Sequence, residues 1–240
     1  MRDVWVVGHR GASGHAPENT LAAFRRAVEL GATFIETDLQ LSRDAHFVAL
    51  HDAALDRTTN GRENVHDFTL AELRELDAGS WFSPEFAGER IPTLEEMLAF
   101  ARATDVVLYL EIKVSEVWGT EQALVAALAD AKMLERVVIL SFDMATLLAV
   151  RKRNPALMTG YLFDWPYPDA VERAIRVGAR QLAPRGDLVT PALIEAARNA
   201  DLQVVTWTIN EPAQMRHLAA AGVHGIMTDY PDRLVAALKE

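Results

Sequence analysis

Short apolar runs recur along the chain and alternate with segments of helical periodicity. The runs cover residues 4–8, 33–41, 106–113, 137–142, 158–163, 180–184, 203–209 and 225–228. Several are apolar almost throughout, which is typical of parallel strands covered on both faces. The pattern therefore predicts eight buried, parallel strands.

The segments between these runs carry helix boundaries. Leu21, Phe24 and Val28 fall on one helix face, and Gly31 follows as a stop. Further boundaries are marked by Thr93 with Glu96, by Asp143 ahead of a helix that ends before Pro155, by Thr190 with Pro191, and by Asn210 with Gly222. Eight strands alternating with helices predict an α/β fold of the (β/α)8 or TIM-barrel type. The main alternative is an open, doubly wound sheet, but no GxGxxG motif follows the first strand.

One interval is too long for a simple strand–helix unit. The second and third strands begin at residues 33 and 106, whereas the other strand starts are about 20–30 residues apart. We expect one domain over residues 1–240, with a segment of about 53–91 inserted after the second strand. Asn60-Gly61 marks a turn in this segment, and residues 69–76 read as a short helix capped by Thr69. Such an insertion lies at the C-terminal face of a barrel, so it is expected to form a lid or side wall of the active site.

Composition narrows the class of protein. The 240 residues are 50% hydrophobic and 24% charged, which suits a well-packed globular domain. The net charge of −10 argues against nucleic acid as a partner. The absence of cysteine excludes disulfides, thiolate metal sites and a cysteine nucleophile. No run approaches the ~20 apolar residues of a membrane span, and no secretory signal is visible, so we expect a soluble, cytoplasmic protein without integral membrane association.

Polar residues at the strand ends carry the candidate chemistry. Gly8-His9-Arg10-Gly11 ends the first strand, where a barrel opens into its active site. His9 can transfer a proton near neutral pH, and Arg10 offers a planar fork for phosphate or carboxylate. A lone histidine at a strand end is more often structural, so this motif gains weight only with further groups beside it.

Two carboxylates share one face of the second strand. Glu36 and Asp38 point the same way and Thr37 the other, because strand residues alternate. Their flanking residues are apolar, and burying two charges together is costly unless a cation is present. Glu111 on the third strand would add a third carboxylate, and three oxygen ligands suit Mg²⁺ or Ca²⁺. Lys113 shares the face of Glu111, where it could bind a substrate anion or simply pair with Glu111.

A second histidine and a tryptophan complete the candidates. Residues 46–50 form a β-like run that returns from the second strand after a turn at 43–45, which carries His51 back to the barrel mouth. His51 and His9 could then act as an acid and base pair. Trp207, at the end of the seventh strand, could equally line a substrate pocket or pack in the core. No GxSxG and no P-loop is present, which weakens serine-hydrolase and nucleotide-hydrolase functions.

Taken in order, these motifs resemble those of the glycerophosphodiester phosphodiesterases, of the bacterial cytosolic type. The resemblance rests on His9-Arg10-Gly11-Ala12, Pro17-Glu18-Asn19-Thr20, Glu36-Thr37-Asp38, His51-Asp52 and Glu111-Ile112-Lys113, and it extends through residues 55–61, 69–76, 91–94, 207–210 and 228–231. It implies a TIM barrel with an insertion after strand 2. It also implies that His9 and His51 are the catalytic pair and that Glu36, Asp38 and Glu111 bind a metal. Arg10 and Lys113 would then be the phosphate-binding residues. Asp44-Ala45 departs from a common Asp-Gly turn, and His15 stands where an aromatic residue is common.

The residues and the resemblance together predict an enzyme of lipid and glycerol metabolism. It is expected to hydrolyse small glycerophosphodiesters, such as glycerophosphocholine or glycerophosphoethanolamine, to sn-glycerol 3-phosphate and an alcohol, with Mg²⁺ or Ca²⁺ as cofactor. The alternative is a lysophospholipase D, with Trp81, Phe82 and Phe86 supplying an apolar groove. A sugar-phosphate isomerase or aldolase and a non-catalytic binding protein fit less well. The sequence leaves open which histidine is the acid and which the base, and whether water or a substrate hydroxyl is the nucleophile. It also leaves open the metal, the preferred head group and the oligomeric state, including whether the protein is a homodimer.

Overall fold

The strands form a closed barrel. The computed structural model describes residues 4–113 and 119–239. Within these ranges the strands are β1 (Trp5–His9), β2 (Phe34–Leu41), β3 (Phe47–Ala49), β4 (Val107–Ile112), β5 (Val137–Ser141), β6 (Met158–Phe163), β7 (Gln181–Pro184), β8 (Gln203–Thr206) and β9 (Gly225–Thr228). All except β3 pair in parallel, and the sheet closes because β1 pairs with both β2 and β9. The expected TIM barrel is confirmed.

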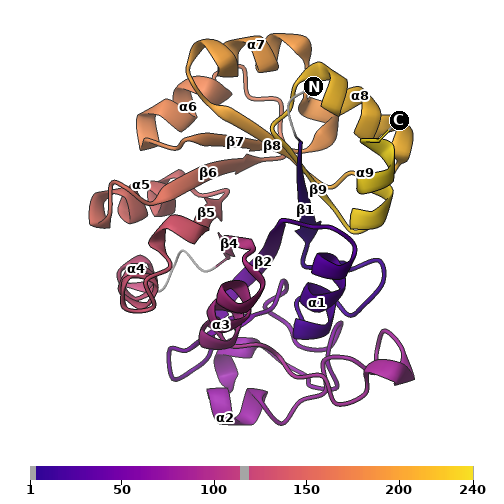
Figure 1. Cartoon of the computed structure of the whole chain (residues 1–240). Coiled ribbons are helices and arrows are strands. Elements are labelled where there is room, and N and C mark those ends of the chain that lie inside the picture. Colours follow the sequence, from indigo (N-terminus) through magenta and orange to yellow (C-terminus); the bar gives the residue numbers. More distant parts are fainter. Residues whose placement is uncertain (1–3, 114–118, 240) are drawn as a thin grey trace.

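Helices surround the barrel (Figure 1). They are α1 (Leu21–Glu29), α2 (Leu70–Leu73), α3 (Leu94–Thr104), α4 (Thr120–Asp130), α5 (Met144–Arg153), α6 (Ala170–Val177), α7 (Pro191–Asn199), α8 (Pro212–Ala221) and α9 (Pro231–Ala237). Short 3-10 turns lie at η1 (Val65–Asp67), η2 (Pro84–Phe86), η3 (Leu134–Arg136) and η4 (Gly186–Leu188). Among the described residues, no helix is long and apolar enough to cross a membrane.

Alternation along the strands separates two cores. Val7, Tyr109, Leu140 and Leu162 pack with one another inside the barrel. The neighbouring strand residues face outward and pack against the helices in a larger cluster. Because side chains alternate across a strand, every second strand residue reaches the barrel interior. The polar residues at the carboxyl ends of the strands therefore lie at one end of the barrel, next to its apolar interior side chains.

The segment between β8 and α8 differs from the sequence expectation. The strand expected over 203–209 ends at Thr206, because the Trp207 N–H bonds to Pro184 and that of Ile209 bonds to Met227, outside the regular β8 ladder. Asn210 does not open α8, whose N-cap is Glu211 followed by Pro212. The Asn210 side chain bonds to the end of β9 instead.

The hairpin expected after the second strand is present. β3 pairs antiparallel with β2, with Ala49 opposite Leu39. The Leu50 N–H then bonds to the carbonyl of Asp38 at 3.2 Å. This return path places His51 beside the end of β2.

The segment 53–91 packs beside α1 and α3, as the magenta part of Figure 1 shows. The expected short helix is present but brief, as α2, and the capping box of Thr69 with Glu72 is confirmed. Its core is a separate small cluster that includes Leu55, Leu73 and Ile91. Arg74 fastens it to α3 through two hydrogen bonds to Glu96, at 2.7 and 2.8 Å.

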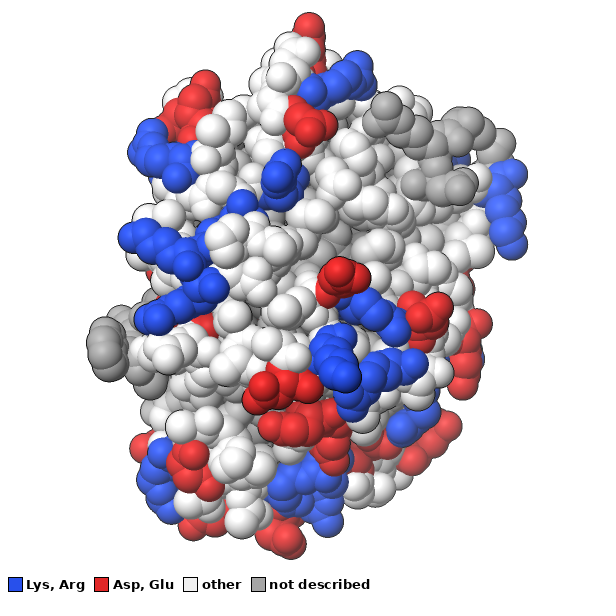
Figure 2. All heavy atoms as spheres, turned by 60° about the vertical axis from the view of Figure 1, so that its left-hand side comes forward, with Lys and Arg blue, Asp and Glu red and all other residues white. Residues whose placement is uncertain are grey.

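Charges of both signs are interspersed on the face turned forward in Figure 2. The net charge of −10 is therefore not gathered on this face as one acidic patch. Mixed charge of this kind favours solubility without naming a partner.

Candidate active site

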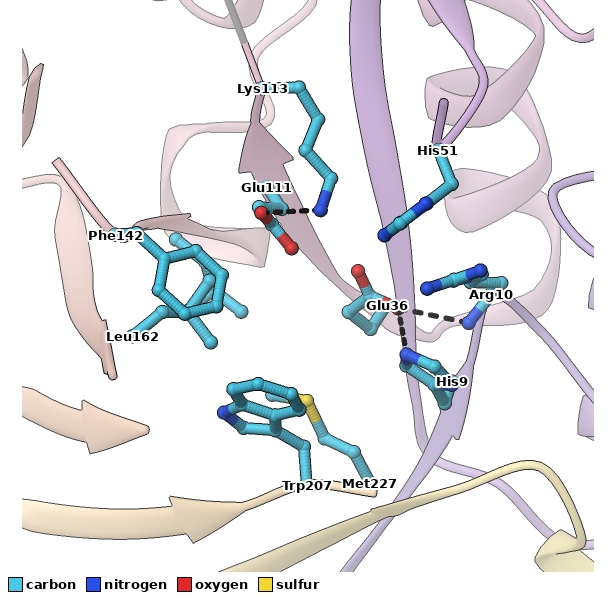
Figure 3. A pocket seen from close by; sticks show the side chains of 11 residues that line it. His9, Arg10, Glu36, His51, Glu111, Lys113, Phe142, Leu162, Trp207 and Met227 are labelled. Atoms are coloured by element: carbon cyan, nitrogen blue, oxygen red, sulfur yellow. Dashed lines mark hydrogen bonds and ion pairs between the residues drawn. The ribbon is translucent and has the colours of Figure 1, made fainter. Parts of the chain in front are cut away.

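A cavity of about 150 Å³ opens at the carboxyl ends of the barrel strands. Its described lining comprises His9, Arg10, Glu36, His51, Glu111, Lys113, Leu140, Phe142, Leu162, Trp207 and Met227. In Figure 3 the charged residues gather on one side of the cavity and the apolar residues on the other. Every sequence-predicted site residue except Asp38 is therefore part of this lining, and Asp38 contacts Arg10 and Lys113 of the lining.

The parallel register explains how distant residues meet. His9 of β1 is the register partner of Glu36 in β2, and Asp38 is the partner of Glu111 in β4. Register partners on neighbouring parallel strands lie side by side, and Glu36 and Asp38 are two residues apart on β2, so the two pairs are adjacent. Three sequence segments thus contribute to one cluster.

The three carboxylates lie close enough to share one cation. Glu36, Asp38 and Glu111 are all buried, and each offers an oxygen within 4.8 Å of the others. Lys113 Nζ lies 2.7 Å from Glu111 Oε1 and 3.2 Å from Asp38 Oδ1. The Lys113–Glu111 ion pair considered at the sequence level is therefore present, within a larger cluster.

The charges of this cluster are unevenly compensated. Burial, together with the charge of Asp38, raises the pKa of Glu36 to about 8 and that of Glu111 to about 7. Burial acts on Asp38 in the same direction, but Lys113 and Arg10 outweigh it and hold the pKa of Asp38 below its usual value. Two carboxylates are therefore hard to ionise beside a third that is charged, because Lys113 and Arg10 do not balance all three. A further positive charge would balance them. This all-oxygen donor set fits a hard divalent cation.

Arg10 and Gly11 form a tight turn above the cluster. Both have positive φ, 55° and 84°, and a side chain on Gly11 would overlap the backbone of Ala23. The Arg10 N–H bonds to Glu36 Oε2 at 2.9 Å. The Arg10 guanidinium contacts Glu18 at 2.7 Å and Asp38 at 3.4 Å. Arg10 thus lies at the cavity with its fork anchored by two carboxylates.

Each of the two histidines is tied to an aspartate through Nδ1. His9 Nδ1 lies 2.7 Å from Asp229 Oδ1, and His51 Nδ1 lies 2.7 Å from Asp52 Oδ1. If Nδ1 holds the proton in these bonds, each Nε2 is left to face the cavity. Such a pairing fixes both the ring orientation and the tautomer.

The two histidines differ in their charge environment. Burial alone would lower the pKa of His9, but the bond to Asp229 and the charge of Glu36 raise it above the usual value. For His51, burial and the nearby Arg10 and Lys113 prevail, and its pKa is lowered. The pair therefore has unequal proton affinities.

The apolar side of the cavity comes from the later strands. Trp207 and Phe142 make an edge-to-face contact with ring centres 5.6 Å apart, and the Trp207 Nε1–H donates to the Ala183 carbonyl at 2.7 Å. Trp207 therefore both lines the cavity and packs against the inner core.

The expectation that residues 53–91 form a lid or wall is wrong for the described lining, which contains none of them. Their path beside α1 and α3 carries Trp81, Phe82 and Phe86 into contact with one another instead.

Comparison with known protein families decides the assignment. The model of the glycerophosphoryl diester phosphodiesterase family matches residues 9–233. The chain belongs to this family. It is accordingly a phosphodiesterase, and the cavity lined by His9, Glu36 and His51 is its candidate active site.

Relatives and solved structures agree over nearly the full length. A glycerophosphodiester phosphodiesterase of Caldanaerobacter subterraneus is 41% identical over 98% of both chains. A structure from Silicibacter pomeroyi, described as a putative glycerophosphoryl diester phosphodiesterase, superposes with a TM-score of 0.90 at 31% identity, covering 99% of this chain and 94% of that one. An Oleispira antarctica phosphodiesterase, solved with the product sn-glycerol-3-phosphate, has a TM-score of 0.90 at 30% identity, covering 98% and 97%.

Asp229 is a residue of the candidate active site that sequence reasoning did not assign, since it binds His9. Besides His9, its carboxylate accepts hydrogen bonds from Ser13 at 2.8 Å and Asn210 at 2.6 Å. The signal available was an acid directly after the last strand, at the same barrel end as His9. Asp52, directly after His51, gave a similar signal.

Asp229 should make stability depend on acid. Burial opposes its ionisation, but the bonds from His9 and Asn210 prevail and lower the pKa of Asp229 to about 2. A lowered pKa stabilises the folded state above the unfolded pKa of about 4, and this contribution is lost as pH falls towards 2. The wild type should exceed Asp229→Asn in unfolding free energy by on the order of 2 kcal/mol at pH 6, with a gap that narrows below pH 4. Urea unfolding of both proteins from pH 2 to 7 measures the gap, and a constant gap would contradict this origin.

Proposed function

We propose that the enzyme hydrolyses glycerophosphodiesters, such as glycerophosphocholine or glycerophosphoethanolamine, to sn-glycerol 3-phosphate and an alcohol, with a divalent cation. The family assignment supports the reaction class, and the product seen in the Oleispira relative supports the glycerol 3-phosphate half. The observation that carries the proposal is the juxtaposition of two aspartate-bound histidines with a buried triad of carboxylates.

His9 and His51 are the proposed proton carriers. A water molecule, or a hydroxyl of the substrate's glycerol, attacks phosphorus and loses its proton to one histidine. The bond from phosphorus to the alcohol oxygen breaks, and the other histidine protonates that oxygen. If the glycerol hydroxyl attacks, water then opens the resulting cyclic phosphate. Asp52 and Asp229 hold the rings so that each Nε2 can face the reacting groups.

Arg10 and Lys113 are the proposed phosphate-binding residues. Both line the cavity, and both sit beside buried carboxylates that fix their position. Their positive charges favour the phosphoryl oxygens, which gain negative charge in the transition state. Glu36, Asp38 and Glu111 would hold Mg²⁺ or Ca²⁺, which supplies further charge stabilisation at phosphorus when bound.

The apolar wall suggests where the rest of the substrate lies. Trp207 is the proposed contact for an organic group of the diester, since it lines the cavity opposite the charged residues (Figure 3). The lysophospholipase D alternative relied on Trp81, Phe82 and Phe86, none of which is among the described lining residues. Small diesters are therefore the favoured substrates.

Release of glycerol 3-phosphate tests the proposal. The purified enzyme is treated with chelator and assayed on glycerophosphocholine, glycerophosphoethanolamine and lysophosphatidylcholine, alone and after addition of Mg²⁺, Ca²⁺ or Mn²⁺. We expect release only with metal, and faster release from the two small diesters. Equal activity in the presence of chelator would contradict the metal requirement, and a preference for lysophosphatidylcholine would favour the alternative.

We also infer that residues 1–240 form one barrel domain with its insertion at about 53–91. The cytoplasmic location stays a prediction from the sequence.

A further inference from the structure

Arg57 links the inserted segment to the active site without lining the cavity. Its guanidinium donates to both oxygens of Glu18, at 2.9 Å to Oε2 and 2.8 Å to Oε1. Its Nε–H donates to Oδ2 of Asp52. Neither Glu18 nor Asp52 is part of the described cavity lining, but each contacts a residue that is, Arg10 and His51 respectively.

These contacts complete a chain of alternating charges. Arg10 pairs with Glu18, Glu18 pairs with Arg57, Arg57 pairs with Asp52, and Asp52 accepts the bond from His51. The chain joins the loop after β1 to the loop after β3. Its two ends, Arg10 and His51, both line the cavity.

The geometry explains why Asp52 needs this partner. The side chain of Asp52 is about one-third exposed, at 35%, so packing alone does not hold it. Oδ1 is bound to His51 and Oδ2 to Arg57, which leaves the carboxylate little freedom to rotate. An arginine that binds two carboxylates through its planar fork fixes direction as well as distance. Burial alone would raise the pKa of Asp52, but the bonds from Arg57 and His51 prevail and lower it, which keeps the carboxylate charged.

We propose that Arg57 is a positioning residue for catalysis. It holds Asp52 so that the His51 ring stays aimed into the cavity, and the inserted segment serves the reaction through this one side chain. The proposal rests on the proposed function, in which His51 carries a proton.

A kinetic comparison separates positioning from a surface ion pair. Arg57→Met keeps the aliphatic stem and removes all three hydrogen bonds, and Asp52→Asn removes the charge at the next link. Arg74→Met is the matched control, since Arg74 lies in the same segment and binds Glu96 through two hydrogen bonds but is not part of the described cavity lining. Arg57→Lys is a second variant that keeps the positive charge. Its single ammonium cannot repeat the planar fork of the guanidinium. Thermal unfolding is recorded for each protein.

We expect Arg57→Met to lower kcat about 10–100-fold with little change in KM, because Arg10 retains Glu18 and Asp38. Arg57→Lys should fall between Arg57→Met and the wild type, and Arg74→Met should keep the wild-type kcat. In the Asp52→Asn background Arg57→Met should cause little further loss, since both changes act on one path. Wild-type kcat in Arg57→Met, or a full multiplicative loss in the double variant, would overturn the proposal. A wild-type enzyme inactive with every metal would instead overturn the proposed function.

Discussion

Replacing His9 or His51 by alanine is expected to lower turnover about 10²–10⁴-fold or more, the usual scale for losing a positioned proton carrier. Each imidazole is bonded to its own aspartate at 2.7 Å and lines the same cavity, so neither can substitute for the other. KM should change less than kcat, because Arg10 and Lys113 remain to bind the phosphate.

Steady-state hydrolysis of glycerophosphocholine at saturating metal measures this effect. His217→Ala is the control, since His217 is exposed on α8 and does not line the cavity. Unfolding curves of all three variants show whether the fold is retained. Near-normal turnover in either active-site variant would remove that histidine from the mechanism.

Replacing Glu36 by glutamine is expected to lower activity about 10³-fold or more while stabilising the metal-free protein at neutral to alkaline pH. Activity should fall because a proposed carboxylate ligand of the metal is lost, and about 4 kcal/mol of barrier corresponds to 10³-fold. Stability rises because a buried charge beside Asp38 disappears. The pKa of Glu36 is about 8 in the folded protein against about 4.5 when unfolded, so the folded state binds the proton more tightly. The metal-free wild type should therefore lose stability as pH rises from about 4.5 through 8, whereas Glu36→Gln should show a smaller loss, the remainder coming from Glu111 with its pKa of about 7.

Denaturant unfolding in chelator from pH 5 to 9, repeated with added Mg²⁺, Ca²⁺ or Mn²⁺, tests the stability part, and hydrolysis of glycerophosphocholine at saturating metal tests the activity part. Metal should raise the stability of the wild type and leave Glu36→Gln largely unchanged, because a ligand that binds only the folded state stabilises it. Glu195→Gln, an exposed change on α7, serves as the control. A variant that metal stabilises as strongly as the wild type would show that Glu36 is not a ligand.

The fold class and the candidate site residues could be predicted from local patterns along the chain. Apolar runs alternating with capped helices require a layered α/β structure, and the 73 residues between the starts at 33 and 106 revealed the insertion. Strand periodicity placed Glu36 and Asp38 on one face with Thr37 on the other, and the Thr37 hydroxyl indeed reaches Met97 of α3 outside the barrel. These properties depend on local residue order, which a sequence contains in full.

Which distant residues meet could be seen only in the folded chain. The register of β1, β2 and β4 puts His9 beside Glu36 and Asp38 beside Glu111. The packing of the insertion against α1 and α3 removed its aromatic residues from the described cavity wall, and only the folded loops bring Arg57 to Asp52 and Glu18. Such contacts depend on strand register and on loop packing across the barrel. Both are set by the summed burial of many side chains, so no local pattern in the chain encodes them.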